Sequence, residues 1–446
     1  MPHFRFSLSS LVLFLLALTS CEGRESAWAA ADALIAAAVE EEIIPGAVLL
    51  VAKDGKVLHE KAYGYAQRYD YGKVEKSEPI LMASDQLFDL ASLTKVFATT
   101  FGLMILVDEK KVDLEVPVYT YLPDFRGTNK DNITVRHLLT HSSGLAPWKP
   151  LYYHADTARD TYATIRDLPL ASPVGQERHY SDLGFMLLGY LIEAVTGQPL
   201  DVFLTEALYE PLGLRSTTFR PRSHGLNGFA VTSHGNPFEK RMVADDDFGY
   251  VCNEDPDSFT RWRTYVLDGE VNDGNAYHAN NGVAGHAGLF STASELNVLM
   301  TLLLNEGVYE GKRFLSEATV VMFLTKDASF ANGLGWAMST DDLPAYEVPE
   351  GSFGHTGFTG TYALGVPSED LSIILLTNRQ NIGVQASGDY HSVDPLRREI
   401  TALLLSSLRR GAFAKLERRL SARKQELGSR DLQTVQPIFE GAFSHL

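Results

Sequence analysis

The chain has 446 residues, of which 45% are apolar and 21% charged, so it can bury a full core and is not mainly disordered. Its formal net charge of −17 argues against sequence-independent binding to nucleic acid, which needs a basic face. The two cysteines exclude a disulfide-rich scaffold and a four-thiolate zinc site.

The N-terminus has the pattern of an export signal. Arg5 precedes an unbroken apolar run over 11–18, which is too short to span a bilayer but suits a secretory segment. The run ends at Leu-Thr-Ser-Cys21, which resembles the lipobox of bacterial lipoproteins, where cleavage precedes a cysteine that is then lipidated. We predict a lipoprotein signal peptide over 1–20 and lipidation at Cys21; the alternative is an ordinary signal peptide with an incidental cysteine. Cys252 is then the one cysteine left in the body of the chain, and we interpret it as a structural thiol.

Strands are predicted near both ends of the chain, and helices between them. Apolar runs around turn residues predict two hairpins, one from 48–52 and 57–63 and one from 361–366 and 371–377. Helical periodicity predicts helices over 26–43, 183–196, 292–304 and about 394–408. The third of these helices opens with Thr292 and Glu295, the pattern of a capping box.

This order predicts an α/β fold in which one antiparallel sheet is built from both chain ends and flanked by helices, with a helical lobe inserted. We expect a catalytic domain over 21–408, its sheet from about 45–64 and 334–378 and its helical lobe at about 90–305. The tail over 409–446 differs, because 409–430 holds eight basic and two acidic side chains. We interpret it as a solvated helix and tether, with an envelope or partner contact as the alternative.

The first chemical signal is Ser92-Leu-Thr-Lys95, followed by an apolar run. Residues three apart face each other on a helix, so the Lys95 amine is expected within reach of the Ser92 hydroxyl. A lysine whose pKa is lowered by burial can take the proton of a serine nucleophile. The pattern alone is weak, and Ser421-Ala-Arg-Lys424 is a second match, which we discard because no apolar run follows it.

Two further motifs accompany Ser92: Tyr180-Ser-Asp182 before the strongest predicted helix, and His355-Thr356-Gly357 before the C-terminal hairpin. Together the three resemble the Ser-x-x-Lys, Tyr-x-Asn and Lys/His-Thr-Gly motifs of serine β-lactamases and penicillin-binding proteins. The tyrosine points to the class C branch, which also holds D-alanyl-D-alanine carboxypeptidases and family VIII carboxylesterases. The stretches that also resemble this branch are 134–145, 211–214 and 285–292, and those closest to its periplasmic carboxypeptidases are 64–70 and 271–276.

The resemblance implies a role for each motif residue. Ser92 would be the nucleophile, and Lys95 and Tyr180 would together act as the general base. The backbone N–H groups of Ser92 and Phe358 would form the oxyanion hole. The residues implied to bind or orient substrate are Asp182, His355, Thr356 and Gly357. No metal and no cofactor is expected.

Two positions depart from the family pattern. Asp182 stands where many members have asparagine, so it would favour a protonated Lys95 and could repel an anionic substrate. His355 stands where many have lysine, so its hold on a carboxylate is expected to depend on its protonation. Both departures weaken the case for a fast β-lactamase.

Other candidate sites have simpler explanations. His137 and His141 have the i,i+4 spacing of metal ligands, but no convincing third ligand accompanies them. His286 fits a structural loop better than a pocket wall. The acidic run over 245–247 lacks the spacing of a calcium loop, and the chain has no Gly-x-Ser-x-Gly motif of α/β-hydrolases.

The sequence therefore predicts an exported, lipid-anchored serine hydrolase of the cell envelope or periplasm that acts on a small peptide, ester or β-lactam. Our first expectation is a D-alanyl-D-alanine carboxypeptidase acting on peptidoglycan stem peptides. The alternatives are a family VIII carboxylesterase, a class C-like β-lactamase and, from a different class, a penicillin sensor or binding module.

Overall fold

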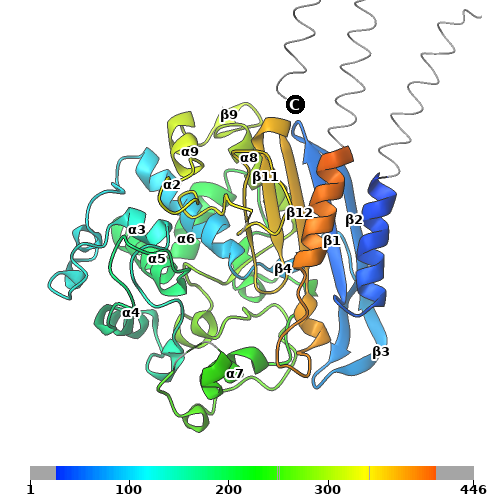
Figure 1. Cartoon of the computed structure of the whole chain (residues 1–446), viewed down its shortest axis with the longest axis horizontal. Helices are drawn as coiled ribbons and strands as arrows, with labels where there is room; N and C mark the ends of the chain where they lie inside the picture. Colours follow the sequence, from blue (N-terminus) through cyan, green and yellow to red (C-terminus); the bar gives the residue numbers. More distant parts are fainter. Residues whose placement is uncertain (1–26, 249, 251, 341, 408–446) are drawn as a thin grey trace, which may run out of the picture. The chain divides into compact units, whose positions relative to one another are not determined.

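A computed structural model describes residues 27–248, 250, 252–340 and 342–407 (Figure 1). Residues Ile35–Arg398 form one compact unit. The described residues outside that unit, 27–34 and 399–407, are helical and continue into it as helices over 27–40 and 394–407. The predicted signal peptide, Cys21 and the basic tail over 409–446 lie outside the described residues.

The main sheet has six antiparallel strands in the order β10-β11-β12-β1-β2-β3. From the N-terminal side come β1 (Gly46–Lys53), β2 (Lys56–Asp70) and β3 (Val74–Leu81); from the C-terminal side come β10 (Phe353–Thr356), β11 (Tyr362–Val366) and β12 (Leu371–Thr377). The two hairpins join where β1 pairs with β12, with Leu50 opposite Ile374. The prediction of a sheet built from both chain ends is confirmed, and the continuously apolar β12 is central.

The sheet differs from the prediction at its outer parts. We did not predict β3, because its sequence Val-Glu-Lys-Ser-Glu-Pro-Ile-Leu is polar and its residues are mostly exposed, as in an edge strand. The expected sheet segment over 334–378 begins later than predicted, since regular pairing starts at Phe353 and a single bridge joins Ala337 to Gly354.

The regular elements between the two hairpins are mainly helices, which are joined by long irregular segments (Figure 1). The helices are α2 (Phe101–Asp108), α3 (Val135–Leu139), α4 (Ala158–Asp167), α5 (Asp182–Thr196), α6 (Leu200–Leu204), α7 (Pro237–Ala244), α8 (Ala293–Leu304) and α9 (Glu317–Phe323). Short 3₁₀ helices lie at Val118–Thr120, Pro123–Phe125, Leu151–Tyr153, Pro221–His224, Asp246–Phe248, Pro256–Ser258, Pro367–Glu369 and Arg379–Ile382, and π-helical turns at Lys95–Thr100, Thr205–Tyr209 and Asn275–Ala279.

The predicted helical lobe also contains strands. A small sheet has the order β5 (Thr218–Phe219), β7 (Leu289–Ser291), β4 (Leu87–Asp89) and β6 (Phe229–Ala230). A separate hairpin joins β8 (Val308–Tyr309) to β9 (Lys312–Arg313). Strands of two or three residues are too short to show a period of two, which is why the sequence pattern did not indicate them.

Helix α8 contacts the main sheet at β12 and β1, although the prediction assigned its residues to the lobe. Its start also differs from a full capping box. Thr292 Oγ1 accepts from the N–H of Glu295 as predicted, but the Glu295 carboxylate accepts from the N–H groups of Arg215 and Ser216 instead of closing the box. Glu295 therefore fastens a loop of the lobe to this helix.

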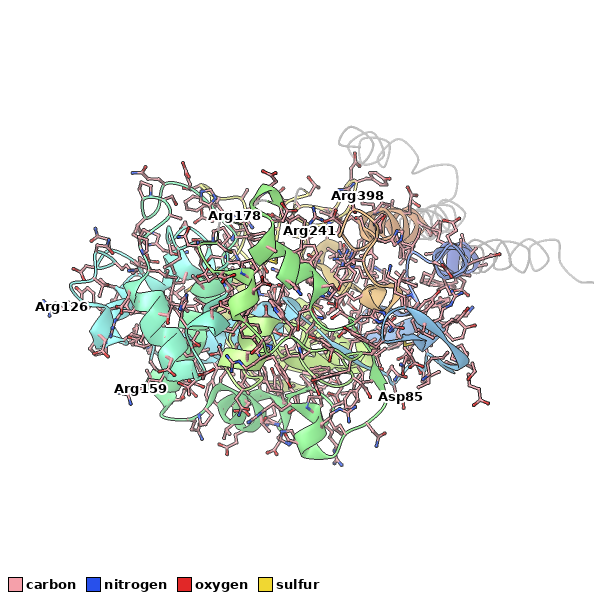
Figure 2. The ribbon with its side chains drawn as sticks, turned by 90° about the horizontal axis from the view of Figure 1, so that it is seen from below. Asp85, Arg126, Arg159, Arg178, Arg241 and Arg398 are labelled. Atoms are coloured by element: carbon pink, nitrogen blue, oxygen red, sulfur yellow. The ribbon has the colours of Figure 1, made fainter. Side chains whose placement is uncertain are left out.

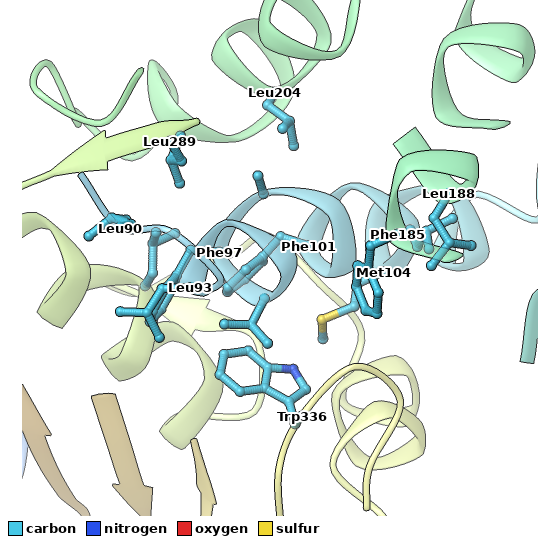
Figure 3. Packing of buried hydrophobic residues seen from close by; sticks show 14 of the residues in the cluster. Leu90, Leu93, Phe97, Phe101, Met104, Phe185, Leu188, Leu204, Leu289 and Trp336 are labelled. Carbon is cyan, nitrogen blue, oxygen red and sulfur yellow. The ribbon is translucent and has the colours of Figure 1, made fainter. Parts of the chain in front are cut away.

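The helix that begins after Ser92 runs through the middle of the core. Its π-helical turn Lys95–Thr100 and most of α2 are buried. Figure 3 shows Phe97, Phe101 and Met104 of this helix among residues of the helical part and the strand β7. The ring of Phe97 meets that of Trp336 edge to face, with centroids 5.7 Å apart. Packing on several sides fixes the position of the residues at the helix start.

Among the described residues, no single helix is long and apolar enough to cross a membrane. The segments Asp182–Thr196 and Leu200–Tyr209 pass that test as a pair, with a bend of 73° between them. Most residues of α5 are buried in the core, which explains their apolar sequence.

Candidate active site

Ser92 lies in the turn between β4 and the buried helix. Ala91, just before it, has a φ of +47°, a left-handed conformation that residues with a Cβ rarely adopt. The Ala91 N–H donates to Asp89 Oδ1 (2.9 Å), and Asp89 Oδ2 accepts from the N–H of Asn272 (2.6 Å). The buried Asp89 carboxyl thus holds the strained turn and ties it to the segment around Asn272.

Lys95 is fully buried, and its ammonium group reaches Ser92. Nζ donates to Ser92 Oγ at 3.0 Å and to the carbonyl of His286 at 3.3 Å. It also lies 2.7 Å from Asp182 Oδ1 and 4.7 Å from the centroid of the Tyr180 ring. The predicted proximity of amine and hydroxyl is therefore present, and three motif residues surround one nitrogen.

Asp182 decides the charge of Lys95. Burial, the largest effect, lowers the pKa of Lys95, but the Asp182 carboxylate and Tyr180 act together in the opposite direction, and the pKa is raised on balance. Lys95 is thus an ammonium at neutral pH. The expectation that burial lowers its pKa is wrong for this resting site, because the carboxylate lies at 2.7 Å; the expectation that Asp182 favours a protonated Lys95 is confirmed.

Tyr180 also rests in its protonated form. Burial raises its pKa most, and the interactions with Lys95 and Ser92, which lower it, do not cancel that effect. The Tyr180 ring stacks at a tilt on His141, with centroids 4.6 Å apart, and His141 Nδ1 accepts from the N–H of Ser181 at 3.0 Å. His141 thus positions the second motif.

His355 lies on β10 and is uncharged. Burial, followed by the nearby Lys95 cation, lowers the pKa of His355 to about 4, although a hydrogen bond to the Thr356 carbonyl acts in the opposite direction. Nδ1 lies 2.7 Å from that carbonyl, so the neutral ring donates through Nδ1 and Nε2 is an acceptor. Protonation of His355 therefore does not govern carboxylate binding near neutral pH, contrary to our expectation.

The third motif is held against the turn that contains Ser92. A Cβ on Gly357 would lie 2.4 Å from the Leu90 carbonyl oxygen, so this close approach requires glycine. Thr361 Oγ1 donates to the same carbonyl (3.0 Å), and Thr359 Oγ1 donates to that of Asp89 (2.7 Å). Movements of either segment are therefore coupled.

The two N–H groups implied for the oxyanion hole are both available. The Gly357 carbonyl accepts from the N–H of Gly360 at 3.0 Å. In a trans peptide the N–H points opposite to the carbonyl, so the Phe358 N–H points away from that turn. Within the described part of the chain, neither this N–H nor that of Ser92 has a hydrogen-bond partner, as is expected of donors that await an oxyanion.

Two pockets meet at Ser92. The first, of about 470 Å³, we call the acidic pocket; its characteristic residues are Trp148, Asp182, Phe238, Glu239, Tyr250 and Asp273. The second, of about 400 Å³, we call the arginine pocket; its characteristic residues are Arg178, Asp342, His355, Arg379, Asp394 and Arg397. Ser92, Arg178, Tyr180 and Phe358 line both. A substrate attacked by Ser92 can thus extend into two chemically different spaces.

The carboxyl groups of the acidic pocket differ in charge. Asp273 Oδ1 lies 2.9 Å from His286 Nε2. Burial, the largest effect, raises the pKa of Asp273, but His286, the N–H of Ala276 and Lys95 together lower it on balance. Burial, with the nearby Asp273, raises the pKa of Glu239 to about 8, while its Oε1 accepts from the N–H of Gly274 at 2.7 Å. At neutral pH Asp273 is therefore an anion and Glu239 a neutral acid.

One cluster in the acidic pocket has the residue types of a metal site. Donor atoms of Asp182, Asp273 and His286 all lie within 4.8 Å of one another. The Lys95 ammonium already lies against Asp182, and a cation bound there would have to compete with it. In this cluster the Lys95 ammonium therefore supplies the positive charge that a metal ion would otherwise supply.

The structure brings the three motifs together but leaves some predicted residues elsewhere. Ser92, Lys95, Tyr180, Asp182 and His355–Phe358 share one site, and Cys21 lies outside the described residues. His286 lines the acidic pocket, contrary to the interpretation of it as a loop residue alone. His137 instead caps α3, with Nδ1 3.1 Å from the Thr134 nitrogen.

Sequence reasoning missed Arg178, Glu239, Asp273 and the aromatic wall of the acidic pocket. Arg178 stands two residues before Tyr180, and Asp273 lies within the segment 271–276 that we had marked as family-like. Those positions were the only hints in the sequence that the two residues belong to the site. A residue's place in the sequence does not tell which cavity its side chain lines. Cys252, interpreted as structural, is buried in a cluster with Trp148 and Met242 and forms no disulfide among the described residues.

The fold and the three motifs define the class of the protein. A model of the Beta-lactamase family matches residues 31–395, and the chain belongs to this family. With Ser92 and Lys95 in hydrogen-bonding contact at the centre of the site, the chain is a serine hydrolase of the β-lactamase and penicillin-binding protein fold.

Curated relatives carry two names. The chain is 36% identical over 361 residues to the "N-acetylmuramyl-L-alanine amidase" of Bacillus subtilis (strain 168), covering 76% of this chain and 78% of the relative. It is 35% identical over 356 residues to the "Putative D-alanyl-D-alanine carboxypeptidase" of Escherichia coli (strain K12), covering 75% and 78%. The two identities are nearly equal, so similarity alone does not choose between the names.

Solved structures share the fold. EstCE1, described as a hydrolase with promiscuous acyltransferase activity, has a TM-score of 0.61 at 21% identity, covering 85% of this chain and 98% of that one. A class C β-lactamase from Rhodobacter sphaeroides has a TM-score of 0.58 at 21% identity, covering 84% and 98%. At this identity the likeness concerns the architecture.

Proposed function

We propose that the protein forms an acyl-enzyme on Ser92 and cleaves the terminal amide of peptides that end in D-alanyl-D-alanine, releasing D-alanine. The observation that carries the proposal is the Ser92–Lys95–Tyr180 cluster at the junction of two pockets, one of which offers guanidinium groups to a terminal carboxylate. The likeness to the relative named as a carboxypeptidase supports it.

In the proposed reaction Ser92 Oγ attacks the amide carbon and transfers its proton to the neutral amine of Lys95 or to the phenolate of Tyr180. The N–H groups of Ser92 and Phe358 stabilise the oxyanion. The leaving amine takes the proton, and the acyl group stays on Ser92. A water molecule then attacks the acyl carbon and gives a proton to Tyr180. The bond between Ser92 Oγ and the acyl carbon breaks, and the proton passes from Tyr180 to Oγ, so that one amide and one water yield an acid and an amine and the free enzyme is restored.

The resting charges set a condition on this reaction. Lys95 and Tyr180 both have raised pKa values and rest in their acid forms. The base forms are therefore a minority at neutral pH, and the acylation rate should increase as the pH rises.

A second candidate is cleavage of the amide between N-acetylmuramic acid and L-alanine, the bond named in the first relative. The acidic pocket favours this candidate, because Trp148, Phe238 and Tyr250 present apolar ring faces beside the hydrogen-bonding carboxyl groups of Glu239 and Asp273. That combination suits a sugar ring. Both candidates share a leaving amino acid with a free carboxylate, whereas a carboxylesterase or β-lactamase substrate need not have one.

One experiment separates the candidates. Purified protein is incubated with a peptide ending in D-alanyl-D-alanine, with N-acetylmuramyl-L-alanine, with a short-chain nitrophenyl ester and, separately, with a labelled penicillin. Products and adducts are quantified for wild type and Ser92→Ala. D-Alanine release that depends on Ser92 supports the first proposal, and L-alanine release the second. Ester hydrolysis without amide cleavage indicates an esterase, and a stable penicillin adduct without turnover indicates a sensor.

We also propose that the protein is exported and anchored through lipid on Cys21, which is supported by the lipobox-like sequence after the apolar run over 11–18. The wild type and a Cys21→Ser variant are fractionated after expression in a bacterial host. The wild type is expected with the membranes and the variant in the soluble fraction of the envelope. A variant that stays with the membranes would contradict the anchor.

A further inference from the structure

We infer that Arg178 is the residue that binds the free carboxylate of the leaving group and so makes the enzyme selective for substrates that end in a carboxylic acid. The inference rests on the proposed function, because it concerns the leaving-group side of the bond that Ser92 attacks. In this inference Arg178, which lies in a loop, provides the positive charge that His355 of the third motif does not provide.

The third motif lacks that charge because His355 is neutral. Burial and the Lys95 cation lower the pKa of His355 to about 4, and its Nδ1 is engaged with the Thr356 carbonyl. Nε2 of the neutral ring carries a lone pair, which repels a carboxylate oxygen. A substrate carboxylate therefore needs another donor near Ser92.

Three arginines line the arginine pocket, and two of them are occupied by the backbone. Arg379 donates from Nε and Nη2 to the Phe358 carbonyl and from Nη1 to that of His391. Arg397 donates from Nη2 to the Thr361 carbonyl and from Nη1 to Asp394. These donors hold the segment around Phe358 in place. The Nε of Arg397 also has no partner among the described residues, but the Arg397 side chain is 6% exposed, against 24% for Arg178, and Arg397 lines only the arginine pocket.

Arg178 is held differently. Its Nη1 donates to Asp342 Oδ1 at 3.1 Å, which fixes one corner of the guanidinium group. Its Nε is buried and has no hydrogen-bond partner within the described part of the chain. A buried donor without an acceptor is costly, and such a group in a pocket indicates that a ligand supplies the acceptor.

The geometry of the guanidinium group suits a carboxylate. With Nη1 on Asp342, the edge formed by Nε and Nη2 offers two parallel N–H groups, the arrangement that binds both oxygens of a carboxylate. Asp342 itself accepts from Ser339 Oγ at 3.0 Å, so the anchor of Arg178 is also held in place.

Arg178 lies where a leaving group needs it. It lines both pockets together with Ser92, Tyr180 and Phe358, and its positive charge acts on both His141 and His355. Figure 2 shows Arg178 in the same part of the view as Arg241, and away from the exposed Arg159 of α4. Arg159 therefore provides a matched control for a substitution at Arg178.

The test compares paired ligands that differ only in the terminal group. Peptides ending in D-alanyl-D-alanine and N-acetylmuramyl-L-alanine are each prepared as the free acid and as the C-terminal amide. Binding of all four is measured by calorimetry to Ser92→Ala, Ser92→Ala/Arg178→Gln and Ser92→Ala/Arg159→Gln, so that turnover is not required. Folding of each variant is checked by its thermal unfolding.

We expect the Ser92→Ala protein to prefer at least one acid over its amide by about 100-fold, the strength of a desolvated bidentate ion pair. Arg178→Gln should remove most of that preference, and Arg159→Gln should keep it. Absence of any acid preference in the Ser92→Ala protein, or a preference that survives Arg178→Gln, would overturn the inference. A penicillin adduct that persists in Ser92→Ala would overturn the proposed function instead, so the two failures are distinguishable.

Discussion

The acidic pocket and the arginine pocket share Ser92 but differ in how they hold their charges. In the arginine pocket, Arg379 and Arg397 are held by backbone carbonyls and Asp394, whereas the more exposed Arg178 is held through Nη1 by Asp342. In the acidic pocket, burial and the neighbouring Asp273 leave Glu239 protonated, and Asp182 is bound to Lys95. One side is prepared for a carboxylate, and the other controls the protons that the reaction needs.

This difference makes the proposed binding of an anionic substrate compatible with a chain of net charge −17. Of the carboxyl groups in the acidic pocket, Asp182 is paired with the Lys95 ammonium and Glu239 is neutral, so the local repulsion is smaller than the total charge suggests. What matters is the charge within a few ångströms of Ser92.

The largest effect should come from the residue where the pockets meet. Ser92→Ala is expected to lower acyl transfer by at least about 1,000-fold, because no other nucleophile replaces the hydroxyl beside Lys95. Product release from the best substrate, measured over hours, checks this. Ser421→Ala, in the discarded Ser-x-x-Lys match, is the matched control and should behave as wild type. Turnover by Ser92→Ala close to the wild-type rate would contradict the site.

The next effect concerns the proton balance of the acidic pocket. Asp182→Asn removes the carboxylate that raises the pKa of Lys95 and leaves burial, which lowers it. In a plot of kcat/KM against pH, the rising limb should move toward lower pH by at least about one unit. At a fixed pH on that limb, kcat/KM should therefore increase roughly tenfold. The exposed Asp85→Asn, labelled in Figure 2, serves as control. A limb that stays in place would show that Asp182 does not set the charge of Lys95.

A smaller effect is expected on stability. The pKa of Glu239 is raised to about 8 by burial, so ionising it in the folded state costs free energy that grows as the pH rises from 4.5 through 8. Glu239→Gln removes that cost and should raise the free energy of unfolding at pH 9 by about 2 to 4 kcal/mol, with little change at pH 5. Denaturant titrations at the two pH values measure this, with the exposed Glu210→Gln as control. Equal effects at both pH values would contradict the assigned pKa.

The smallest effect tests the arginine pocket. His355 has a pKa of about 4 and stays neutral above pH 5.5, so the affinity for an acid substrate should vary less than about twofold between pH 5.5 and 8. The acid and amide ligands, titrated into Ser92→Ala across this range, provide the measurement. Acid affinity that falls steeply around pH 6.5, with flat amide affinity, would restore a charged His355 as the carboxylate partner.

The features that depend on the spacing of nearby residues could be predicted from the sequence. Apolar runs and turn residues indicated β1, β2, β11 and β12, and the three-residue interval predicted the contact of Lys95 with Ser92. The polar edge strand β3 and the small sheet with β4 were not indicated, because their strands are exposed or too short to show a period. Residue spacing predicts a contact reliably where residues that are close in the chain are also close in space.

The features that were missed depend on contacts between distant segments. The raised pKa of Lys95 needs Asp182, 87 positions away, and the neutral His355 needs burial by segments that surround β10. Arg178 was visible in the sequence, but its place at both pockets and its contact with Asp342 depend on the folded chain. Such relations follow from tertiary structure and not from a motif.

The central claim is that Ser92 carries the acyl group, and its most direct test is the intact mass of the protein after exposure to a labelled penicillin. The account predicts that the wild type gains the mass of one penicillin, that the gain appears faster at pH 8.5 than at pH 6.5, and that Ser92→Ala gains none. An adduct of the same mass on Ser92→Ala would show that another residue is the nucleophile and would contradict the account.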